Sequence, residues 1–463
     1  MRFQFKYLQI PKLFILSAAF FLGAVPASAV AVHVDLTRHL ADHVRTSGRP
    51  ITSTDSFFGT VGAGRLIVVN GNDFDLDSRV TSAVIMLNGE QVLGPGSFDE
   101  EVAEIEIPVD LVADNTISVE LRGKPGRLLT VRVKQEEDVS LNITNRIHFN
   151  TNVSDYDASR AFYFSIGIVG GFGFPDTNTL EVAEAIGVDT PTEYDGSEGP
   201  EAGGYLLHGN LIFLSSFGGL FIDLIEFTIP RNNEPPYANL NHLGMARAAL
   251  LTNNLDSDYA YMTGVLGAEF LSPPTSRSNG TRFAIFKDPD GTYYELIEVS
   301  PPLPLPTAIT NIVSIAQVNV NVSDFERSRA FYRMLGFTGS TPLAPTDSLE
   351  VAQAMGFDEE YLIEGELVIF PGDGSAIELV QWIEPFDPSP PYPLPINHFG
   401  INRLAYSTSD LQADVDALTA QGIEFVSPIA PCCSGPSSTT GIITFYDPDG
   451  TLIELVGAIT PPE

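Results

Sequence analysis

The sequence has almost no cysteine. It contains two among 463 residues, and these are neighbours, Cys432 and Cys433. A framework of several disulfides is therefore excluded. Adjacent α-carbons lie ~3.8 Å apart, closer than the roughly 4.4–6.8 Å of ordinary disulfides, so a bridge between the pair would be strained and readily reduced. Three interpretations stay open: two inert thiols in a loop, which we expect, a labile vicinal disulfide, or a pair that acts on a ligand.

Basic residues are also scarce. Lys and Arg total 24 against 59 Asp and Glu, and the formal net charge is −35. Nucleic acid is therefore not expected as a partner, because phosphate binding needs concentrated Lys and Arg. The acidic excess is typical of a solubility device, for example in salty surroundings. An apolar content of 44% with 18% charged residues indicates a globular chain.

Long hydrophobic runs are missing after the first 29 residues. Those residues combine a basic start, "MRFQFKYLQIPK", a short apolar run, "LFILSAAFFLGAV", and small residues, "ASA", at 27–29. This is the pattern of an export signal, and the run is too short to span a bilayer comfortably. We therefore predict a signal peptide at 1–29 and export to the periplasm or the cell exterior. No stable membrane insertion is expected after cleavage; an uncleaved anchor is the alternative.

Residues 30–140 contain short alternating or apolar runs, among them "RLIVVNGNDF", "SAVIMLNGEQVL", "TISVELRGK" and "RLLTVRVKQ". Turn signals such as "NGND", "NGE" and "GKPG" separate them at close, even spacing. This pattern predicts an all-β sandwich. The stretch also resembles small β-sandwich modules that stand beside other domains in exported bacterial proteins, where they space or anchor.

The rest of the chain repeats. "NVSDYDASRAFY" at 152–163 returns as "NVSDFERSRAFY" at 321–332, "NHLGMARAAL" at 241–250 as "NHFGINRLAY" at 397–406, and "DPDG" at 288–291 recurs at 447–450. Each copy is itself a doublet in which a strand leads into a helix and then into further strands. The sequence therefore predicts an α+β architecture of four βαβββ units, in two tandem domains at 143–300 and 309–460.

The strand before "NVSDxxxSRAFY", the "NHxGxxR" segment and the "DPDGxxxEL" ending together resemble the vicinal-oxygen-chelate superfamily. It includes glyoxalase I, bleomycin-resistance proteins and extradiol dioxygenases. The resemblance covers about 143–460, roughly two thirds of the chain. It implies that two βαβββ units pair into a cup-shaped sheet and that strands of both units supply metal ligands. This chain would then hold two such cups.

The resemblance also implies eight ligand positions. Imidazole and carboxylate groups together suit Fe, Mn, Ni, Co or Zn, so a divalent metal of this group is the expected cofactor. Arg247 and Arg403 follow two of the candidate histidines by five residues, an odd offset that predicts the opposite strand face and a structural ion pair. The expected ligands are His148, Asp223, His242 and Glu295 in the first copy and Gln317, Glu378, His398 and Glu454 in the second.

Two main hypotheses for function follow. In the first, the chain is a metal-dependent lyase, isomerase or dioxygenase that acts on a small oxygen-bearing substrate, and Glu295 or Glu454 moves a proton. In the second, it binds or sequesters a small molecule without catalysis, as bleomycin-resistance proteins do. A third hypothesis makes the β-sandwich an adhesion element. The sequence leaves the substrate, the metal and the oligomeric state open.

Overall fold

The computed structural model describes residues 33–35, 43–46, 49–71, 78–136, 141–173, 177–188, 205–214, 220–305, 309–432 and 438–459. The predicted signal peptide at 1–29 and the second cysteine, Cys433, lie outside these ranges. Among the described residues, no helix is long and apolar enough to cross a membrane.

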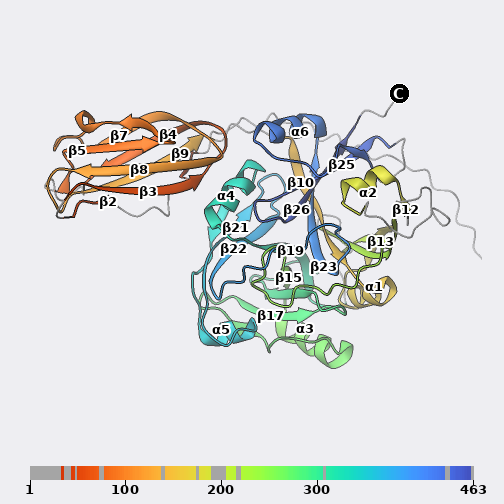
Figure 1. The fold of residues 1–463 in the computed structure, drawn as a ribbon. Helices are drawn as coiled ribbons and strands as arrows, with labels where there is room; N and C mark the ends of the chain where they lie inside the picture. Colours follow the sequence, from red (N-terminus) through yellow and green to blue (C-terminus); the bar gives the residue numbers. More distant parts are fainter. Residues whose placement is uncertain are drawn as a thin grey trace, which may run out of the picture. The chain divides into compact units, whose positions relative to one another are not determined.

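The N-terminal part is an all-β sandwich, as predicted (Figure 1). One sheet has the order β1-β9-β4-β7, with β2 on β9, and the other has the order β3-β8-β5-β6. Alternate residues of β5 and β8 are buried, which is the period of a strand with one face on a core. The elements are β1 (His33–Asp35), β2 (His43–Val44), β3 (Ile51–Phe58), β4 (Gly62–Asn70), β5 (Ser82–Leu87), β6 (Glu90–Leu93), η2 (Pro95–Ser97), β7 (Glu104–Leu111), β8 (Asp114–Arg122) and β9 (Leu128–Glu136).

Four βαβββ units follow, which confirms the predicted fold class. We call them units 1 to 4 in chain order. Unit 1 comprises β10 (Ile143–Asn152), α1 (Tyr156–Ser165), β11 (Gly170–Gly173), β12 (Thr177–Asn178), α2 (Leu180–Ala185), β13 (Tyr205–Phe213) and β14 (Phe221–Ile229). Unit 2 comprises β15 (Arg247–Thr252), α3 (Leu255–Tyr261), the one-turn π-helix η3 (Met262–Leu266), β16 (Thr275–Ser276), β17 (Arg282–Lys287) and β18 (Tyr293–Glu298).

The second half has the same order of elements. Unit 3 comprises β19 (Ile312–Asn321), α4 (Phe325–Met334), β20 (Gly339–Pro342), α5 (Leu349–Ala354), β21 (Leu362–Ile369) and β22 (Ala376–Glu384). Unit 4 comprises β23 (Gly400–Thr408), α6 (Leu411–Ala420), β24 (Ala430–Pro431), β25 (Thr440–Tyr446) and β26 (Leu452–Ala458).

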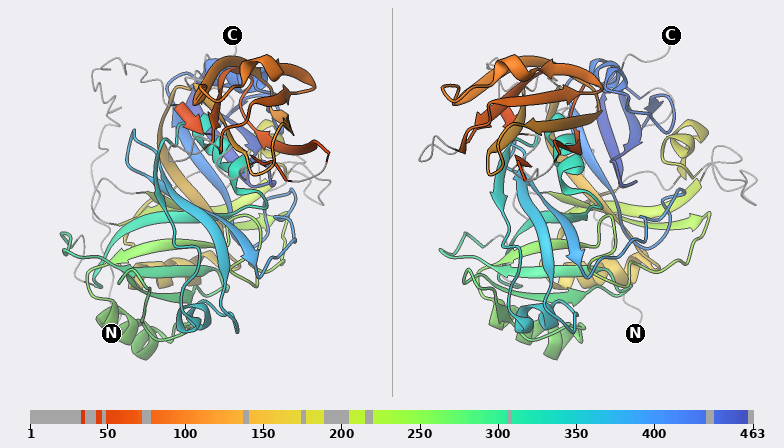
Figure 2. Two further views of the ribbon diagram at one scale, coloured as in Figure 1. Left: turned by 90° about the vertical axis from the view of Figure 1, so that its left-hand side faces the viewer. Right: turned by 60° about the vertical axis from the view of Figure 1, so that its left-hand side comes forward.

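The sheets do not pair the units in chain order. A nine-stranded sheet joins unit 1 to unit 4, because β10 lies antiparallel to β23. An eight-stranded sheet joins unit 2 to unit 3 through the antiparallel pair β15 and β19. In Figures 1 and 2 the ochre strand of unit 1 accordingly runs beside blue strands of unit 4. The predicted pairing within 143–300 and within 309–460 is therefore wrong at the level of the sheets.

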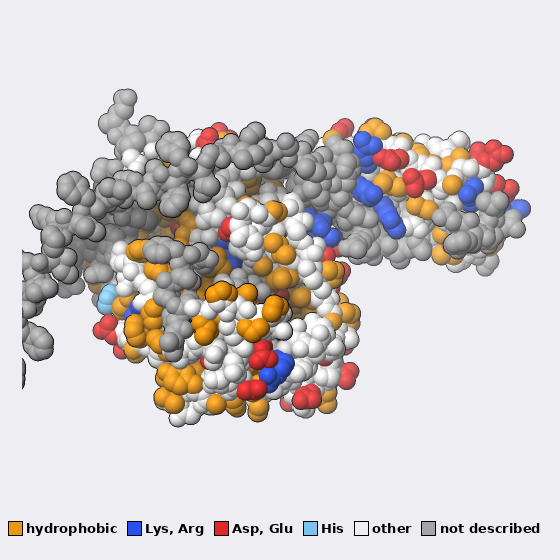
Figure 3. Space-filling view, turned by 180° about the vertical axis from the view of Figure 1, so that it is seen from behind, with side chains coloured by type: hydrophobic (Ala, Val, Ile, Leu, Met, Phe, Trp, Pro, Cys, Tyr) orange, Lys and Arg blue, Asp and Glu red, His pale blue; other side chains and the backbone are white. Residues whose placement is uncertain are grey.

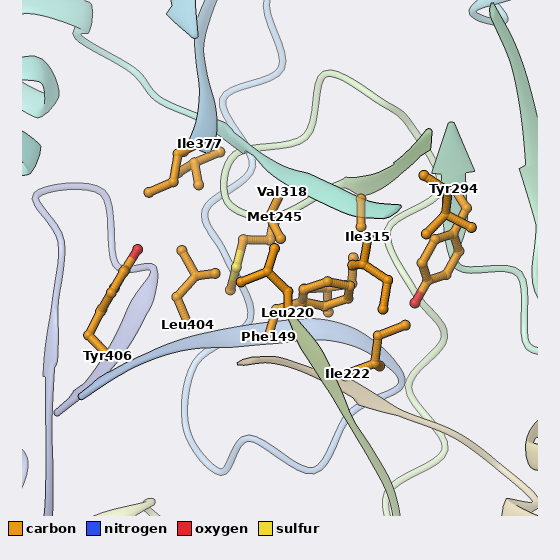
Figure 4. Packing of buried hydrophobic residues seen from close by; sticks show 14 of the residues in the cluster. Phe149, Leu220, Ile222, Met245, Tyr294, Ile315, Val318, Ile377, Leu404 and Tyr406 are labelled. Atoms are coloured by element: carbon orange, nitrogen blue, oxygen red, sulfur yellow. The ribbon is translucent and has the colours of Figure 1, made fainter. Parts of the chain in front are cut away.

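A shared hydrophobic core explains why both sheets bury one face. Phe149 of β10 and Leu404 of β23 face this core from the nine-stranded sheet, while Ile315 and Val318 of β19 face it from the other. Figure 4 shows these side chains packed against one another. Because strand residues alternate, the neighbouring positions point to the opposite face of each sheet. That opposite face carries the polar residues discussed below.

The repeated asparagine of "NVSD" holds the repeated "NHxG" segment of the connection between two units. The amide of Asn321, at the end of β19, donates to the carbonyls of Leu240 and His242, both at 2.7 Å. Asn152, at the end of β10, donates in the same way to Ile396 and His398. These motifs therefore stabilise the crossing of the chain between the two sheets.

The "DPDG" turn also contacts a repeated helix. Asp288 accepts the N–H groups of Asp290 and Thr292 in its own turn and the hydroxyl of Tyr163 in α1 at 2.9 Å. Asp290 accepts the backbone N–H of Ser154, just before the same helix, at 2.9 Å. The turn of unit 2 thus packs on the helix of unit 1, although the two units belong to different sheets.

The second copy repeats this arrangement. Asp447 accepts the hydroxyl of Tyr332 in α4 at 3.0 Å, and Asp449 accepts the backbone N–H of Ser323 at 3.1 Å. The leading aspartates of both turns are fully enclosed, and burial raises the pKa of Asp288 and of Asp447 from the ordinary 3.8 to about 6.

We predict that Asn321→Ala destabilises the chain by about 3 kcal/mol, because two carbonyls and the indole N–H of Trp382, which donates to Asn321 at 2.9 Å, lose their partner. Asn152→Ala serves as the matched comparison. Its amide oxygen has no partner, so the loss should be about 1 kcal/mol smaller. Urea unfolding of the two variants measures the difference, and equal losses would contradict the assignment.

A second prediction concerns pH. A carboxyl whose pKa is raised on folding contributes stability that is present below its unfolded pKa and is lost as the pH rises through the folded value. We expect Asp447→Asn to remove part of the loss of unfolding free energy between about pH 4 and pH 6. The amide keeps an oxygen for the turn N–H groups. Urea unfolding across this range tests it, and wild-type and variant curves that run parallel would refute it.

Candidate functional site

The polar faces of the two sheets form two sites, which we call cup A and cup B. Cup A lies on the nine-stranded sheet and cup B on the eight-stranded sheet. In each cup, two of the four polar side chains come from the first strand of a βαβββ unit and two come from the last strand of a unit. Cup A contains His148, Asp223, Arg403 and Glu454. Cup B contains Arg247, Glu295, Gln317 and Glu378.

A buried guanidinium occupies the centre of cup A. Arg403 of β23 donates through Nη2 to Oδ2 of Asp223 in β14 at 2.9 Å. Its Nε lies 2.8 Å from Oε2 of Glu454 in β26, an ion pair that does not have the angle of a hydrogen bond. Nδ1 of His148 lies 3.9 Å from Oδ2 of Asp223. All four side chains are at least nine-tenths buried.

Burial has the largest effect on the pKa values of the titratable side chains in cup A. It raises the pKa of Asp223 to about 6 although Arg403 opposes the shift, and it raises the pKa of Glu454 against the same arginine. Burial, with repulsion from Arg403 and Arg146, holds the pKa of His148 well below its ordinary value. His148 is therefore neutral, and its Nδ1 is an open position for a hydrogen bond.

A cavity of about 160 Å³ adjoins these groups. Apart from the four polar residues, its described lining is apolar or aromatic. Val182 of α2 and Ile186, just after that helix, form part of its wall. The remaining lining residues are Val182, Ile186, Tyr205, Leu207, Leu211, Ile225, Phe227, Cys432 and Ile442.

Cup B has two guanidinium groups. Nη2 of Arg247 in β15 lies 2.8 and 2.7 Å from the two oxygens of Glu378 in β22, and its Nε donates to Glu295 in β18 at 3.1 Å. Nη2 of Arg277, in the loop after β16, lies 2.8 Å from the other oxygen of Glu295. Gln317 lines the same cavity of about 200 Å³.

The two arginines change the electrostatics of cup B. Burial alone would raise the pKa of Glu295, but Arg277 and Arg247 hold it below its ordinary value. Glu295 is thus an ionised carboxylate with arginines at both of its oxygens, which makes it a poor proton acceptor. In cup A the balance differs, with one arginine facing two carboxyl groups.

The structure corrects the placement of His242 and His398. Both lie in the connections before β15 and β23, outside the lining of either cup. His242 stacks on Tyr237 with ring centres 3.9 Å apart, and its Nδ1 lies 2.8 Å from the carbonyl of Leu243. Nδ1 of His398 lies 2.9 Å from the carbonyl of Phe399, and burial with the nearby His242 lowers its pKa to about 4.

Glycine explains the error. Gly244 and Gly400 stand between each histidine and the following arginine with φ of +90° and +99°, a conformation that interrupts the two-residue period of a strand. The odd offset therefore does not place Arg247 and Arg403 on the outer face. They point into the cups, so the predicted ion pairs exist but lie at the centres of the two sites and not on the opposite strand face.

The structure thus distributes the eight predicted ligand residues between the two cups differently from the prediction. Three of them meet in cup A, three meet in cup B, and two lie in neither. The three in cup A are His148, Asp223 and Glu454; the three in cup B are Glu295, Gln317 and Glu378; the other two are His242 and His398.

The sequence holds a signal for the missed arginines. Each unit's first helix starts after an Asp or Asn that caps it: Asp155, Asn254, Asp324 and Asp410. The residue seven positions before each cap is the one that enters a cup. Counting back in this way gives His148, Arg247, Gln317 and Arg403.

Arg277 was missed as well, and it has a counterpart in cup A. The segments "SPPTSR" and "SPIAPC" align, which matches Arg277 with Cys432. Each follows a two-residue strand at the edge of its sheet. Cys432 is disulfide-bonded, and Cys433 is the only other cysteine in the sequence. The expectation of an inert thiol is therefore wrong for Cys432, while Cys433 lies outside the described residues. The wall of cup A is apolar where cup B has a charge.

The donor sets do not fit a divalent metal. Guanidinium cannot act as a metal ligand, because it stays protonated in proteins and has no free lone pair. In both cups such a group fills a first-strand position and forms ion pairs with carboxylates that a metal would need as ligands. In the described part of the chain, no three His, Cys, Asp or Glu side chains are grouped as a metal would need.

The family comparison agrees with the fold. Residues 314–455, which span units 3 and 4, match the model described as Glyoxalase/Bleomycin resistance protein/Dioxygenase superfamily. The match covers units 3 and 4, and units 1 and 2 repeat the same βαβββ frame. The predicted resemblance is confirmed. No curated protein sequence matches the chain.

Solved structures of the superfamily are also similar. Glyoxalase I from Zea mays is 17% identical over 69% of this chain and 92% of its own, with a TM-score of 0.42. A mutant 4-hydroxymandelate synthase from Streptomyces coelicolor is 13% identical over 70% and 95%, with a TM-score of 0.23. A glyoxalase family protein from Bacillus cereus is 18% identical over 33% and 99%, with a TM-score of 0.29. These values carry no information about the chemistry of this chain.

We predict that Arg403→Met destabilises the chain by about 3–5 kcal/mol at pH 8, because Asp223 and Glu454 stay buried without their cation. The loss should shrink toward pH 5, since both carboxyls then take up protons. Thermal unfolding of wild type and variant at the two pH values measures this. The triple variant with Asp223→Asn and Glu454→Gln should recover most of the stability, and a pH-independent loss would contradict the assignment.

Proposed function

We propose that this chain binds a small molecule in cup A without a metal. The observation that carries this proposal is Arg403. Its guanidinium holds the position from which a first-strand side chain would bind the metal, and it contacts Asp223 and Glu454. The polar cluster thus contains a cation of its own, and it borders a cavity with apolar walls.

This arrangement has the general features of a ligand site. Small-molecule sites are concave and mostly apolar, with a few polar groups that fix the orientation of the ligand. An apolar cavity of roughly 150 Å³ accepts benzene, and the cavity of cup A has about 160 Å³. A molecule with a single ring or a short branched chain matches this space.

Metal-dependent catalysis finds less support in the residues. Glu295, one of the two predicted proton carriers, is held ionised by Arg247 and Arg277. Glu454, the other, contacts Arg403. Membership of a superfamily that includes enzymes does not require this chain to be one. We therefore favour binding or sequestration over a lyase, isomerase or dioxygenase.

The proposal also includes two predictions made from the sequence, on export and on nucleic acid. Export through residues 1–29 would place the cups outside the cytoplasm, where they could capture a molecule from the surroundings. Nucleic acid is not a proposed partner, in keeping with the net charge of −35. On the face shown in Figure 3, basic side chains are few and stand among acidic ones.

Toluene is a suitable first probe, because it tests the apolar cavity alone. At tenfold excess over Kd it should raise the Tm of the full chain by roughly 2 °C or more, and EDTA should not change this. Leu211→Phe, opposite Asp223 in the sheet, should block the effect. Leu367→Phe, opposite Glu378 in cup B, is the matched control and should leave it intact.

Two outcomes would refute the proposal. One is that toluene leaves the Tm of both the wild type and Leu211→Phe unchanged. The other is that the effect requires an added divalent metal and disappears with EDTA.

A further inference from the structure

We propose that cup A selects a ligand with a cationic head, such as a protonated amine, joined to a compact apolar body. This inference rests on the proposed binding function and adds the charge of the ligand. It follows from three observations on cup A: its charge balance, its unpartnered polar atoms and the contrast with cup B.

The first observation is an excess of negative charge. Arg403 is the one cation among the described side chains that line the cavity, and it faces two carboxyl groups, Asp223 and Glu454. The neighbouring Arg146 does not line the cavity, and its guanidinium donates to the carbonyls of Ala316 and Ala376. The lining therefore carries one negative charge that no lining side chain compensates when both carboxyls are ionised.

The second observation is that two buried polar atoms of cup A have no hydrogen-bond donor. Oδ1 of Asp223 and Nδ1 of His148 have no hydrogen-bond partner among the described residues. Both side chains are more than nine-tenths buried and both line the cavity. Carboxylate oxygen accepts hydrogen bonds, and Nδ1 of a neutral imidazole accepts in the tautomer that carries its proton on Nε2. An ammonium group supplies up to three N–H donors without being an acceptor.

Unpartnered hydrogen-bond donors are also present in cup A. They raise the alternative of a ligand with an anionic head. Nη1 and Nε of Arg403 lack hydrogen-bond partners, so an anionic head could in principle bind there. An anion would, however, enter beside two carboxylates that already hold this arginine. A buried charge needs a compensating partner, and the uncompensated charge of cup A is negative. The charge balance therefore favours the cation.

The third observation is that the related cup differs at these points. Cup B has Arg277 where cup A has the disulfide-bonded Cys432, and Gln317 where cup A has His148. The second arginine balances the two glutamates of cup B. The same βαβββ frame thus carries one neutralised site and one site with an open negative charge.

Benzylamine, benzyl alcohol and benzoate test the inference against toluene. They have similar apolar bodies and differ in the charge of the head. Isothermal titration of the full chain at pH 7.5 should give benzylamine an affinity about tenfold or more above that of benzyl alcohol. Benzoate should bind more weakly than toluene.

Asp223→Asn provides the decisive variant, because it removes the charge and keeps the shape. It should abolish the preference for benzylamine, and toluene binding within a few-fold of wild type shows that the cavity is still folded. Leu367→Phe in cup B is the control variant that should leave both the preference and toluene binding unchanged. Benzoate binding as tightly as benzylamine, or a preference that survives Asp223→Asn, would overturn the inference. If toluene binds without any preference for benzylamine, the inference fails and the proposed function stands. If toluene and benzylamine both fail to bind, the inference and the proposed function are both refuted.

Discussion

A guanidinium buried between carboxylates is the interaction on which both sites depend. Arg403 in cup A and Arg247 in cup B each join two last strands that come from different units. Removing Arg403 would leave Asp223 and Glu454 buried without a counter-charge, and removing Arg247 would leave Glu378 without its partner, which costs far more than the pair contributes to stability. The arginines therefore serve as fixed internal cations. Each occupies the first-strand position in its cup where the resemblance led us to expect His242 or His398 as a metal ligand.

The repeated sequence motifs serve the frame more than the chemistry. Asn152 and Asn321 hold the two connections that cross between the sheets, and Asp288 and Asp447 hold the "DPDG" turns against helices of the neighbouring units. Together they allow unit 1 to share a sheet with unit 4, and unit 2 with unit 3. The two cups share an arginine and a glutamate. They differ where cup A has His148, Asp223 and Cys432 and cup B has Gln317, Glu378 and Arg277.

Much of this could be predicted from the sequence, and the limits are physical. His148 and Gln317 lie on strands that run straight into a helix cap, so strand periodicity placed them correctly. His242 and His398 were misplaced because Gly244 and Gly400 interrupt that periodicity. The exchange of units between sheets could not be predicted, since both pairings satisfy the same strand patterns and nearness in sequence is only a preference. The arginines could have been found by counting back from the helix caps.

The most direct test of the central claim is a metal titration of wild type and Arg403→His. If the arginine stands in place of a metal ligand, stripped wild-type protein should show no Ni²⁺ or Zn²⁺ binding that depends on His148. The variant should gain one such site per chain, lost again in the double variant with His148→Ala, because imidazole and carboxylate groups suit these ions. A wild-type site of one equivalent that His148→Ala removes would contradict the account.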